Sequence, residues 1–196
     1  YGDCKDKANL MLAGNHDLVV AGVIETEGFN AIAKRSVEWT RDQLSAEDRE
    51  LLGNLPLQYV DGDYCYTHAS PLDPMRFSYI RTLEEVGEVF SHIGQRFCFV
   101  GHTHLPVIVS MAKKTGRMEI LRETRVRLKD GDRYFINVGS IGQPRDSNPD
   151  ACCLLLDEEE SSMEFVRIPY DISKSQGKIL SNGLPSYLAE RLMLAR

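Results

Sequence analysis

The chain has 196 residues, of which 42% are apolar and 27% are charged, and its formal net charge at pH 7 is -6. Such a composition can supply the core of one globular domain of ordinary to large size. The negative charge disfavours duplex DNA or RNA as a bulk partner, because a phosphate backbone is bound through positive charge.

The lack of recognisable targeting signals and the cysteine usage indicate a cytoplasmic protein. No apolar stretch approaches the length of a membrane span, and no signal-like segment opens the chain. The five cysteines show no C-x-x-C spacing, and three or more lie in strand-like apolar runs. We therefore expect reduced, buried thiols and no membrane partner.

The first half of the chain alternates predicted strands and helices. An apolar run at 9–13 predicts a short buried strand, and 30–44 has a loosely helical pattern with Asn30 as N-cap. Ser45 resembles the cap of a second helix, which ends near Gly53.

Next comes a predicted hairpin, followed by a helix and a strand. Residues 57–68 form two alternating runs joined by Asp61-Gly62, a dipeptide suited to a tight turn. Thr82 and Glu85 form a capping box for a helix that leads into the apolar strand 96–100.

Short apolar runs dominate the second half and predict consecutive antiparallel strands at 106–111, 118–121, 124–128, 133–138, 151–156 and 163–168. The acidic stretch 157–162 is interpreted as a solvated turn. Two short helices close the chain, the first capped by Asp171 and the second with Pro185 in its first turn. The order of elements predicts an α/β fold in which two sheets form a sandwich flanked by helices.

Four of the five histidines fall just after predicted strands: His16, His68, His102 and His104. Because ligands of α/β sheets bind outside the carboxyl ends of strands, these residues could converge. His92 lies inside a predicted helix and is interpreted as structural or exposed.

Imidazoles, the amide of Asn15 and the carboxylate of Asp17 together indicate a borderline divalent metal. His102 and His104 could share one ion only if the chain turns between them, because alternate residues of an extended segment point opposite ways. A plain strand end with two exposed imidazoles remains an alternative for this pair. A single structural zinc is a weaker interpretation, since cysteine ligands are absent nearby.

The ordered motifs "GNHD" (14–17), "THASP" (67–71) and "GHTH" (101–104) resemble the calcineurin-like metallophosphoesterase superfamily. The segments "INVGSIGQPRD" and "GLPSYLAERL" are similar to its compact bacterial members, predicted phosphoesterases. The resemblance implies a hydrolase with two divalent ions, Mn, Fe, Ni or Zn, and attack of a metal-bridging hydroxide on a phosphoester.

The resemblance also implies roles for individual residues. One metal would be bound by Asn15, His68 and His102, and the other by His104. His16 would protonate the leaving oxygen, with Asp17 orienting its ring. Arg145 would contact the substrate, although a surface salt-bridging arginine is an equal alternative. The substrate is expected to be a small molecule or nucleotide, with phosphodiesterase, pyrophosphatase and protein phosphatase activities all open.

The sequence departs from the superfamily at its start. The Asp-x-His and Gly-Asp motifs of that superfamily do not precede Asn15, and Gly2-Asp3 lies too close to "GNHD" to be the second of them. We therefore interpret 1–196 as a single metallophosphoesterase domain that lacks its N-terminal metal-binding segment, and we expect it to be inactive alone. The rival interpretation is a catalytically degenerate scaffold with the same fold, which the presence of His16 disfavours.

Overall fold

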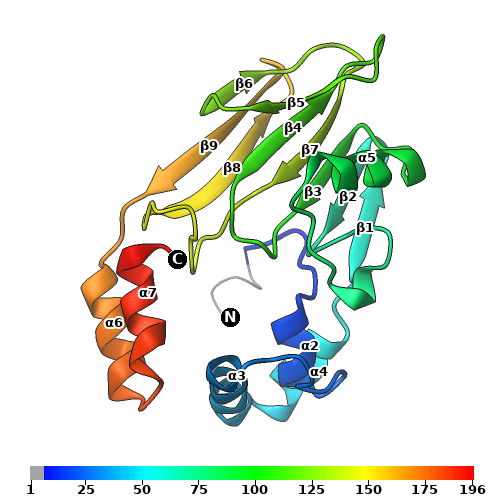
Figure 1. Ribbon diagram of the computed structural model, residues 1–196. Coiled ribbons are helices and arrows are strands. Elements are labelled where there is room, and N and C mark those ends of the chain that lie inside the picture. The colour runs from blue at the N-terminus through cyan, green and yellow to red at the C-terminus, as the bar shows by residue number, and fades with distance from the viewer. Residues whose placement is uncertain (1–6) are drawn as a thin grey trace.

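The protein folds as two β-sheets with helices around them, in a computed structural model that describes residues 7–196 (Figure 1). The predicted two-sheet α/β architecture is confirmed. A six-stranded sheet has the order β1-β2-β3-β7-β4-β5, and a three-stranded sheet has the order β6-β9-β8. The strands are β1 (Gln58–Asp61), β2 (Tyr64–Thr67), β3 (Phe97–Val100), β4 (Val107–Met111), β5 (Met118–Leu121), β6 (Arg125–Arg127), β7 (Arg133–Asn137), β8 (Ala151–Asp157) and β9 (Ser162–Ile168).

The helices begin where the sequence supplies caps. They are α2 (Asn15–Ala21), α3 (Ala31–Gln43), α4 (Ala46–Gly53), α5 (Leu83–His92), α6 (Ile172–Ser181) and α7 (Ser186–Leu194), with a 3-10 turn at Pro74–Arg76. The predicted caps Asn30, Ser45, Thr82 and Asp171 each accept a hydrogen bond from a backbone N–H of the first turn. Pro185 is the N-cap of α7 and so precedes its first turn.

The predicted β1–β2 hairpin is present, with its turn one residue later than expected. Asp61 pairs with Tyr64, so Gly62 and Asp63 make the turn. Gly62 has a φ of 52°, a left-handed conformation that glycine adopts without steric cost.

The strand predicted at 9–13 is wrong, because this segment joins neither sheet in the described part of the chain. Ala13 donates its backbone N–H to the carbonyl of Pro56 at 2.9 Å, in the loop that precedes β1. Asn9 and Leu10 are exposed. An apolar run becomes a strand only where a neighbour offers a ladder of hydrogen bonds, and the loop offers a single one.

The prediction of consecutive antiparallel strands is correct for β4 with β5 and for β8 with β9. It is wrong for β7, which pairs in parallel with β3 and antiparallel with β4. The chain inserts β7 between two strands that are consecutive in the sequence, an arrangement that local periodicity cannot reveal.

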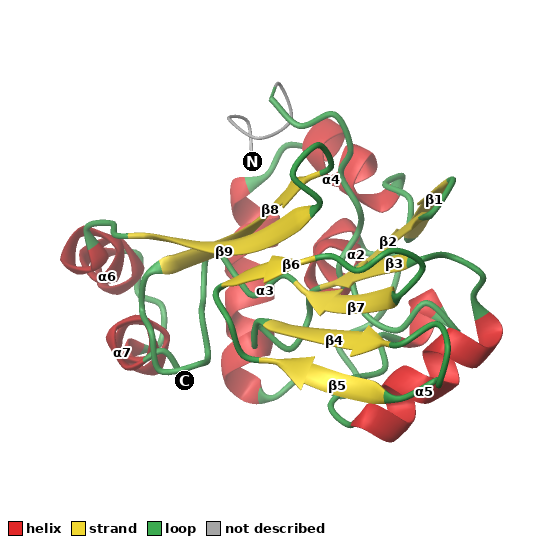
Figure 2. Ribbon diagram, turned by 90° about the horizontal axis from the view of Figure 1, so that it is seen from above, coloured by secondary structure: helices red, strands yellow, loops and turns green. Residues whose placement is uncertain are grey.

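The six-stranded sheet is the middle of three layers. On one face Val86, Val89 and Phe90 of α5 pack against Cys98 and Phe135 of the sheet. The other face packs against the three-stranded sheet through a second apolar cluster, which includes Phe99, Ile136, Val126, Met163 and Leu156. Figure 1 shows the remaining helices beyond one end of the strands, and Figure 2 shows α6 and α7 side by side.

The burial of the cysteines agrees with the prediction. Cys65, Cys98 and Cys152 are free and buried, and Cys153 is half-buried. Cys4 lies outside the described residues. The acidic turn between β8 and β9 is exposed as expected.

Within residues 7–196, no helix combines the length and the apolar character needed to cross a membrane.

Candidate functional site

Three neighbouring parallel strands, β2, β3 and β7, end at the same edge of the six-stranded sheet. His68 follows β2, and Gly101-His102 follow β3. The His68 Nε2 and His102 Nδ1 atoms are 3.2 Å apart, although the residues are 34 positions apart in sequence. The predicted convergence of these two imidazoles at the carboxyl ends of strands is confirmed.

The "GHTH" segment turns sharply instead of continuing as a strand. His102 and His104 have φ angles of 62° and 63°, a left-handed conformation that is uncommon for residues other than glycine. Thr103 donates its backbone N–H to the Gly101 carbonyl at 2.7 Å, which closes the turn. The bend frees the two imidazoles from the alternation of an extended strand, as sharing a site requires.

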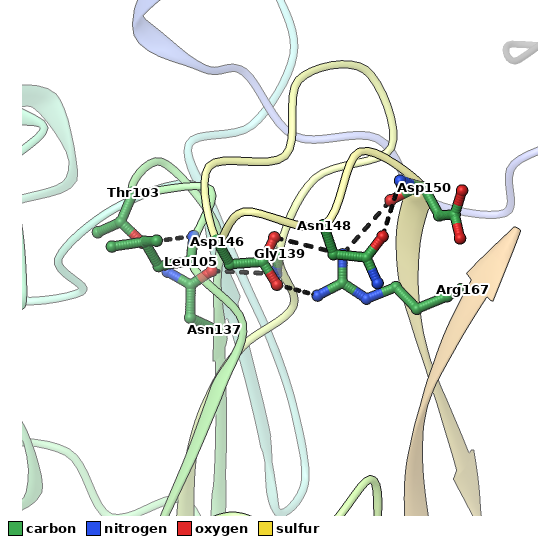
Figure 3. A network of polar contacts seen from close by, with 8 residues as sticks. All are labelled: Thr103, Leu105, Asn137, Gly139, Asp146, Asn148, Asp150 and Arg167. Atoms are coloured by element: carbon green, nitrogen blue, oxygen red, sulfur yellow. Dashed lines mark hydrogen bonds and ion pairs between the residues drawn. The ribbon is translucent and has the colours of Figure 1, made fainter. Parts of the chain in front are cut away.

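Asn137, the last residue of β7, holds this turn in place (Figure 3). Its side chain, 2% exposed, donates to the Thr103 hydroxyl at 2.9 Å and to the Gly101 carbonyl. Its amide oxygen accepts from the Gly139 N–H at 3.1 Å. A residue other than glycine in the left-handed conformation costs about 1–3 kcal/mol. The hydrogen bonds of the buried Asn137 amide supply the constraint that keeps His102 and His104 in this conformation.

The ring of His104 is oriented by a backbone carbonyl. Its Nδ1 lies 2.7 Å from the Gln143 carbonyl oxygen, which can only accept a hydrogen bond. Nδ1 therefore carries the proton, and Nε2 keeps the lone pair that a metal needs. A carbonyl partner on the second ring nitrogen is the usual support of a ligating histidine.

Burial keeps the imidazoles neutral. Desolvation, reinforced by the neighbouring imidazoles, lowers the pKa of His68 to about 4. Desolvation is also the main cause that lowers the pKa of His102 to about 4, and the neighbouring His104 adds to this shift. Desolvation also lowers the pKa of His104. At neutral pH these rings are in the form that binds metal.

The predicted ligand Asn15 is the first residue of α2, directly after Gly14, which lies against the His68 ring. A Cβ added to the preceding Gly14 would lie 3.0 Å from His68 Cε1, so a larger residue there would force the His68 ring to shift. The donor types and the His68–His102 pair fit a borderline divalent ion. Within residues 7–196, however, no three His, Cys, Asp or Glu side chains converge closely enough to hold one by themselves.

His16 lies beside this group on α2, is exposed, and contacts Phe29 with a 4.8 Å separation of the ring centroids. Desolvation lowers its pKa, and the charge of Asp17 opposes that shift. Asp17 accepts a hydrogen bond from the Gly14 N–H at 2.8 Å and so caps the start of α2. The predicted orientation of the His16 ring by Asp17 stays a prediction.

Arg145 is half-buried at the same edge. Its backbone N–H donates to the His104 carbonyl at 3.3 Å, and its guanidinium donates to Gln143 Oε1 at 3.0 Å. The ion pair found among residues 7–196 joins Arg167 and Asp146 instead, which weakens the salt-bridge alternative for Arg145. Figure 3 shows this pair beside the Asn137 network, tying the loop after β7 to β9.

Sequence reasoning missed three residues that shape the site. Tyr79 stacks on His102 with 4.1 Å between ring centroids, and Gln143 and Asn137 fix His104 and the turn. Asn137 has a recognisable signal, a polar side chain that ends the buried run of β7. Tyr79 has none, and Gln143 lies in the segment "INVGSIGQPRD", whose resemblance to the superfamily assigns it no role. His92 was interpreted correctly, because it is exposed at the end of α5 and bonds to the Glu88 carbonyl of the same helix.

A cavity of about 610 Å³ opens beside the imidazoles. Its apolar walls come from both sheets and include Tyr66, Phe99, Leu154 and Leu156, while His68, His102 and His104 line its polar end. The protein is thus a sandwich of two β-sheets. Its six-stranded sheet carries a cluster of neutral imidazoles where the parallel strands end.

Comparison with known proteins shows which proteins this chain resembles. No protein-family profile matches the sequence. The uncharacterized protein MJ0912 of Methanocaldococcus jannaschii is 35% identical over an aligned length of 196 positions, and the alignment covers 98% of this chain and 78% of that protein. The crystal structure of a metallophosphoesterase from Sphaerobacter thermophilus superposes with a TM-score of 0.81 at 31% identity, over 96% of this chain and 77% of the other.

A more distant structure shares the fold. The hypothetical protein PH1004 of Pyrococcus horikoshii has a TM-score of 0.77 at 18% identity, over 100% of this chain and 77% of the other. The match to the Sphaerobacter thermophilus metallophosphoesterase shows that the chain belongs to the calcineurin-like metallophosphoesterase superfamily, as its motifs indicated.

Proposed function

We propose that the protein is a metal-dependent phosphoester hydrolase acting on a small molecule or nucleotide. The observation that carries the proposal is the pair of neutral imidazoles of His68 and His102, 3.2 Å apart at the carboxyl ends of β2 and β3. Likeness to a solved metallophosphoesterase supports it.

In this proposal Asn15, His68 and His102 contribute ligands to one divalent ion and His104 contributes to a second, chosen from Mn, Fe, Ni or Zn. Further oxygen ligands are needed, because the described residues supply an incomplete set. When bound, such ions supply Lewis-acid chemistry that polarises phosphoryl oxygens and acidifies water.

The protein's own side chains perform the remaining tasks. A water molecule loses a proton to the solvent, its oxygen forms a bond to phosphorus, and the bond from phosphorus to the leaving oxygen breaks. His16 gives its proton to that oxygen, so an alcohol or phenol departs neutral. The guanidinium of Arg145 binds phosphoryl oxygens and offsets their charge. The exposed position of His16 on α2 suits this role, because an acid must reach the substrate.

The test is hydrolysis of bis(4-nitrophenyl) phosphate by the complete gene product. We expect EDTA to abolish the activity and Mn²⁺ to restore it, and we expect His68→Ala to lower metal content and rate together. His92→Ala, which removes an exposed imidazole from α5, should behave as the wild type. Absence of hydrolysis with all four metals would favour the catalytically degenerate scaffold, and a chelator-resistant rate would exclude the metal-dependent mechanism.

A further inference from the structure

An exposed aromatic ring lies flat on one of the predicted metal ligands. Tyr79 stacks on His102 with 4.1 Å between the ring centroids and 24° between the ring planes. Tyr79 is 43% exposed, and it belongs to none of the apolar clusters found in residues 7–196. The position of this ring is therefore explained by its contact with the imidazole and not by burial in a core.

The loop that carries Tyr79 is fastened on both sides of the ring. Before it, the Ser70 N–H donates to the Ser78 carbonyl at 3.2 Å, which ties the loop to the segment that follows β2. After it, the Arg81 N–H donates to Glu85 Oε2 at 2.7 Å at the start of α5. The Arg81 guanidinium also lies over the Tyr79 ring, 4.2 Å from its centroid, an attractive contact between a cation and an aromatic ring. Both the backbone and the ring of Tyr79 are thus held in place.

A second aromatic residue of the same loop differs from Tyr79 in its burial. The Phe77 ring centroid lies 6.4 Å from that of His102 and 6.0 Å from that of His68. Phe77 is buried, however, in an apolar cluster that includes Leu18 of α2. Its replacement would disturb the packing of this cluster together with the histidines, whereas Tyr79 can be replaced without removing a core residue.

We propose that Tyr79 is a positioning residue for the metal ligand His102. Stacking restricts rotation of the imidazole about its side-chain bonds and so keeps its Nδ1 atom 3.2 Å from Nε2 of His68. A ligand that is already oriented in the free protein loses less conformational freedom when a metal binds, and this preorganisation raises the affinity. The inference rests on the proposed function for the presence of a metal at His102, whereas the stack itself is measured without metal.

The first measurement is NMR of the histidine ring protons in the metal-free complete gene product, with His102→Ala to assign the signals. Protons that lie over an aromatic ring resonate upfield, so the His102 ring protons should lie upfield of those of the exposed His92. Tyr79→Ala should abolish this shift, and Tyr79→Phe, which keeps the ring, should preserve it. A His102 spectrum that Tyr79→Ala leaves unchanged would overturn the stack.

The second measurement is the affinity for Zn²⁺, by competition with a chromophoric chelator. We expect Tyr79→Ala to weaken zinc binding about two- to tenfold, the cost of ordering one side chain that the substitution has freed. Tyr79→Phe should bind zinc as the wild type does. In a His102→Ala background, Tyr79→Ala should have no further effect, because the ring then has no ligand to position. A merely structural role of Tyr79 would not depend on His102 in this way.

Tyr59→Ala is the matched control, because Tyr59 on β1 is 44% exposed and its ring contacts Tyr66 and not a histidine. It should bind zinc as the wild type does, and circular dichroism should show all variants folded. Zinc affinity that His68→Ala weakens but Tyr79→Ala leaves unchanged would overturn the positioning role, and so would an equal effect of Tyr79→Ala with and without His102. A protein that shows the upfield shift but binds no Mn, Fe, Ni or Zn would instead reject the proposed function, and with it the ligand role of His102.

Discussion

At the scale of single residues, the site combines imidazoles of similar chemistry in different surroundings. Desolvation lowers the pKa of His68 and His102 to about 4, and it also lowers the pKa of His16, where the charge of Asp17 opposes the shift. An enclosed, neutral ring suits a ligand, and a ring near a carboxylate more easily keeps a proton. This contrast supports different roles for histidines that the sequence presents alike.

Replacing His16 by Ala should separate the acid from the ligands. We expect the variant to keep its metals and to lose about 10²–10⁴-fold in rate on esters with poor leaving groups, because those oxygens need a proton in the transition state. An activated aryl ester should suffer much less. Rates on both ester types and metal content of the complete gene product check this, and equal losses accompanied by lost metal would identify His16 as a ligand.

The lowered pKa values of the enclosed histidines predict a stability that depends on pH. Because His68 and His102 have pKa values of about 4 in the folded protein, the unfolded chain binds more protons between about pH 4 and 6.5. The free energy of unfolding of the metal-free protein should therefore decrease as the pH falls from 6.5 towards 5, a range in which most carboxylates do not yet titrate. Guanidinium chloride unfolding at several pH values measures it.

The variant His68→Gln/His102→Gln provides the comparison for this experiment. It removes both imidazoles, so its free energy of unfolding should depend less steeply on pH over the same range. Identical slopes for the variant and the wild type would show that the two rings have ordinary pKa values.

At the scale of elements, the turn after β3 depends on a residue from β7. Replacing Asn137 by Ala leaves the partners of a buried amide unsatisfied, and each such group costs about 1–3 kcal/mol. We expect Asn137→Ala to lower the free energy of unfolding by at least that amount and to weaken metal binding, because the left-handed turn loses its support. Thermal or denaturant unfolding, with metal titration, checks both effects.

Asn148→Ala is the control for this prediction. Asn148 also bonds to a backbone N–H, that of Asp150 at 3.0 Å, but it is only half-buried and lies outside the turn. Its loss should cost near the lower end of about 0.5–1.5 kcal/mol and leave metal binding unchanged. Equal effects of the two substitutions would mean that Asn137 has no special role in the turn.

Most elements could be predicted from the sequence, because their signals are local. A cap such as Thr82 with Glu85, or a turn at Gly62, acts within a few residues, and the structure has helix or hairpin at each of these places. The run 9–13 failed because a strand needs a partner, and that partner is not encoded in the run itself. The sequence did not predict the parallel pairing of β7 with β3 for the same reason.

At the scale of the whole molecule, the site is assembled from segments that are distant in the chain. The motif residues His68, His102 and His104 could be found because they follow strands and match an ordered set of motifs. Tyr79 could not, because its relevance comes only from the loop that the fold brings to this edge, and for Gln143 the resemblance gives a motif position without a role. The sequence thus predicts the reactive groups better than it predicts the groups that position them.

The central claim is that the imidazoles at the carboxyl ends of β2 and β3 form a metal centre. Zinc K-edge X-ray absorption of the complete gene product, loaded with Zn²⁺ and freed of excess metal, tests it directly. The account predicts imidazole scattering in the first coordination shell, and a marked loss of bound zinc in His68→Ala with none in His92→Ala. A shell of oxygen atoms alone, or zinc content that His68→Ala leaves unchanged, would contradict it.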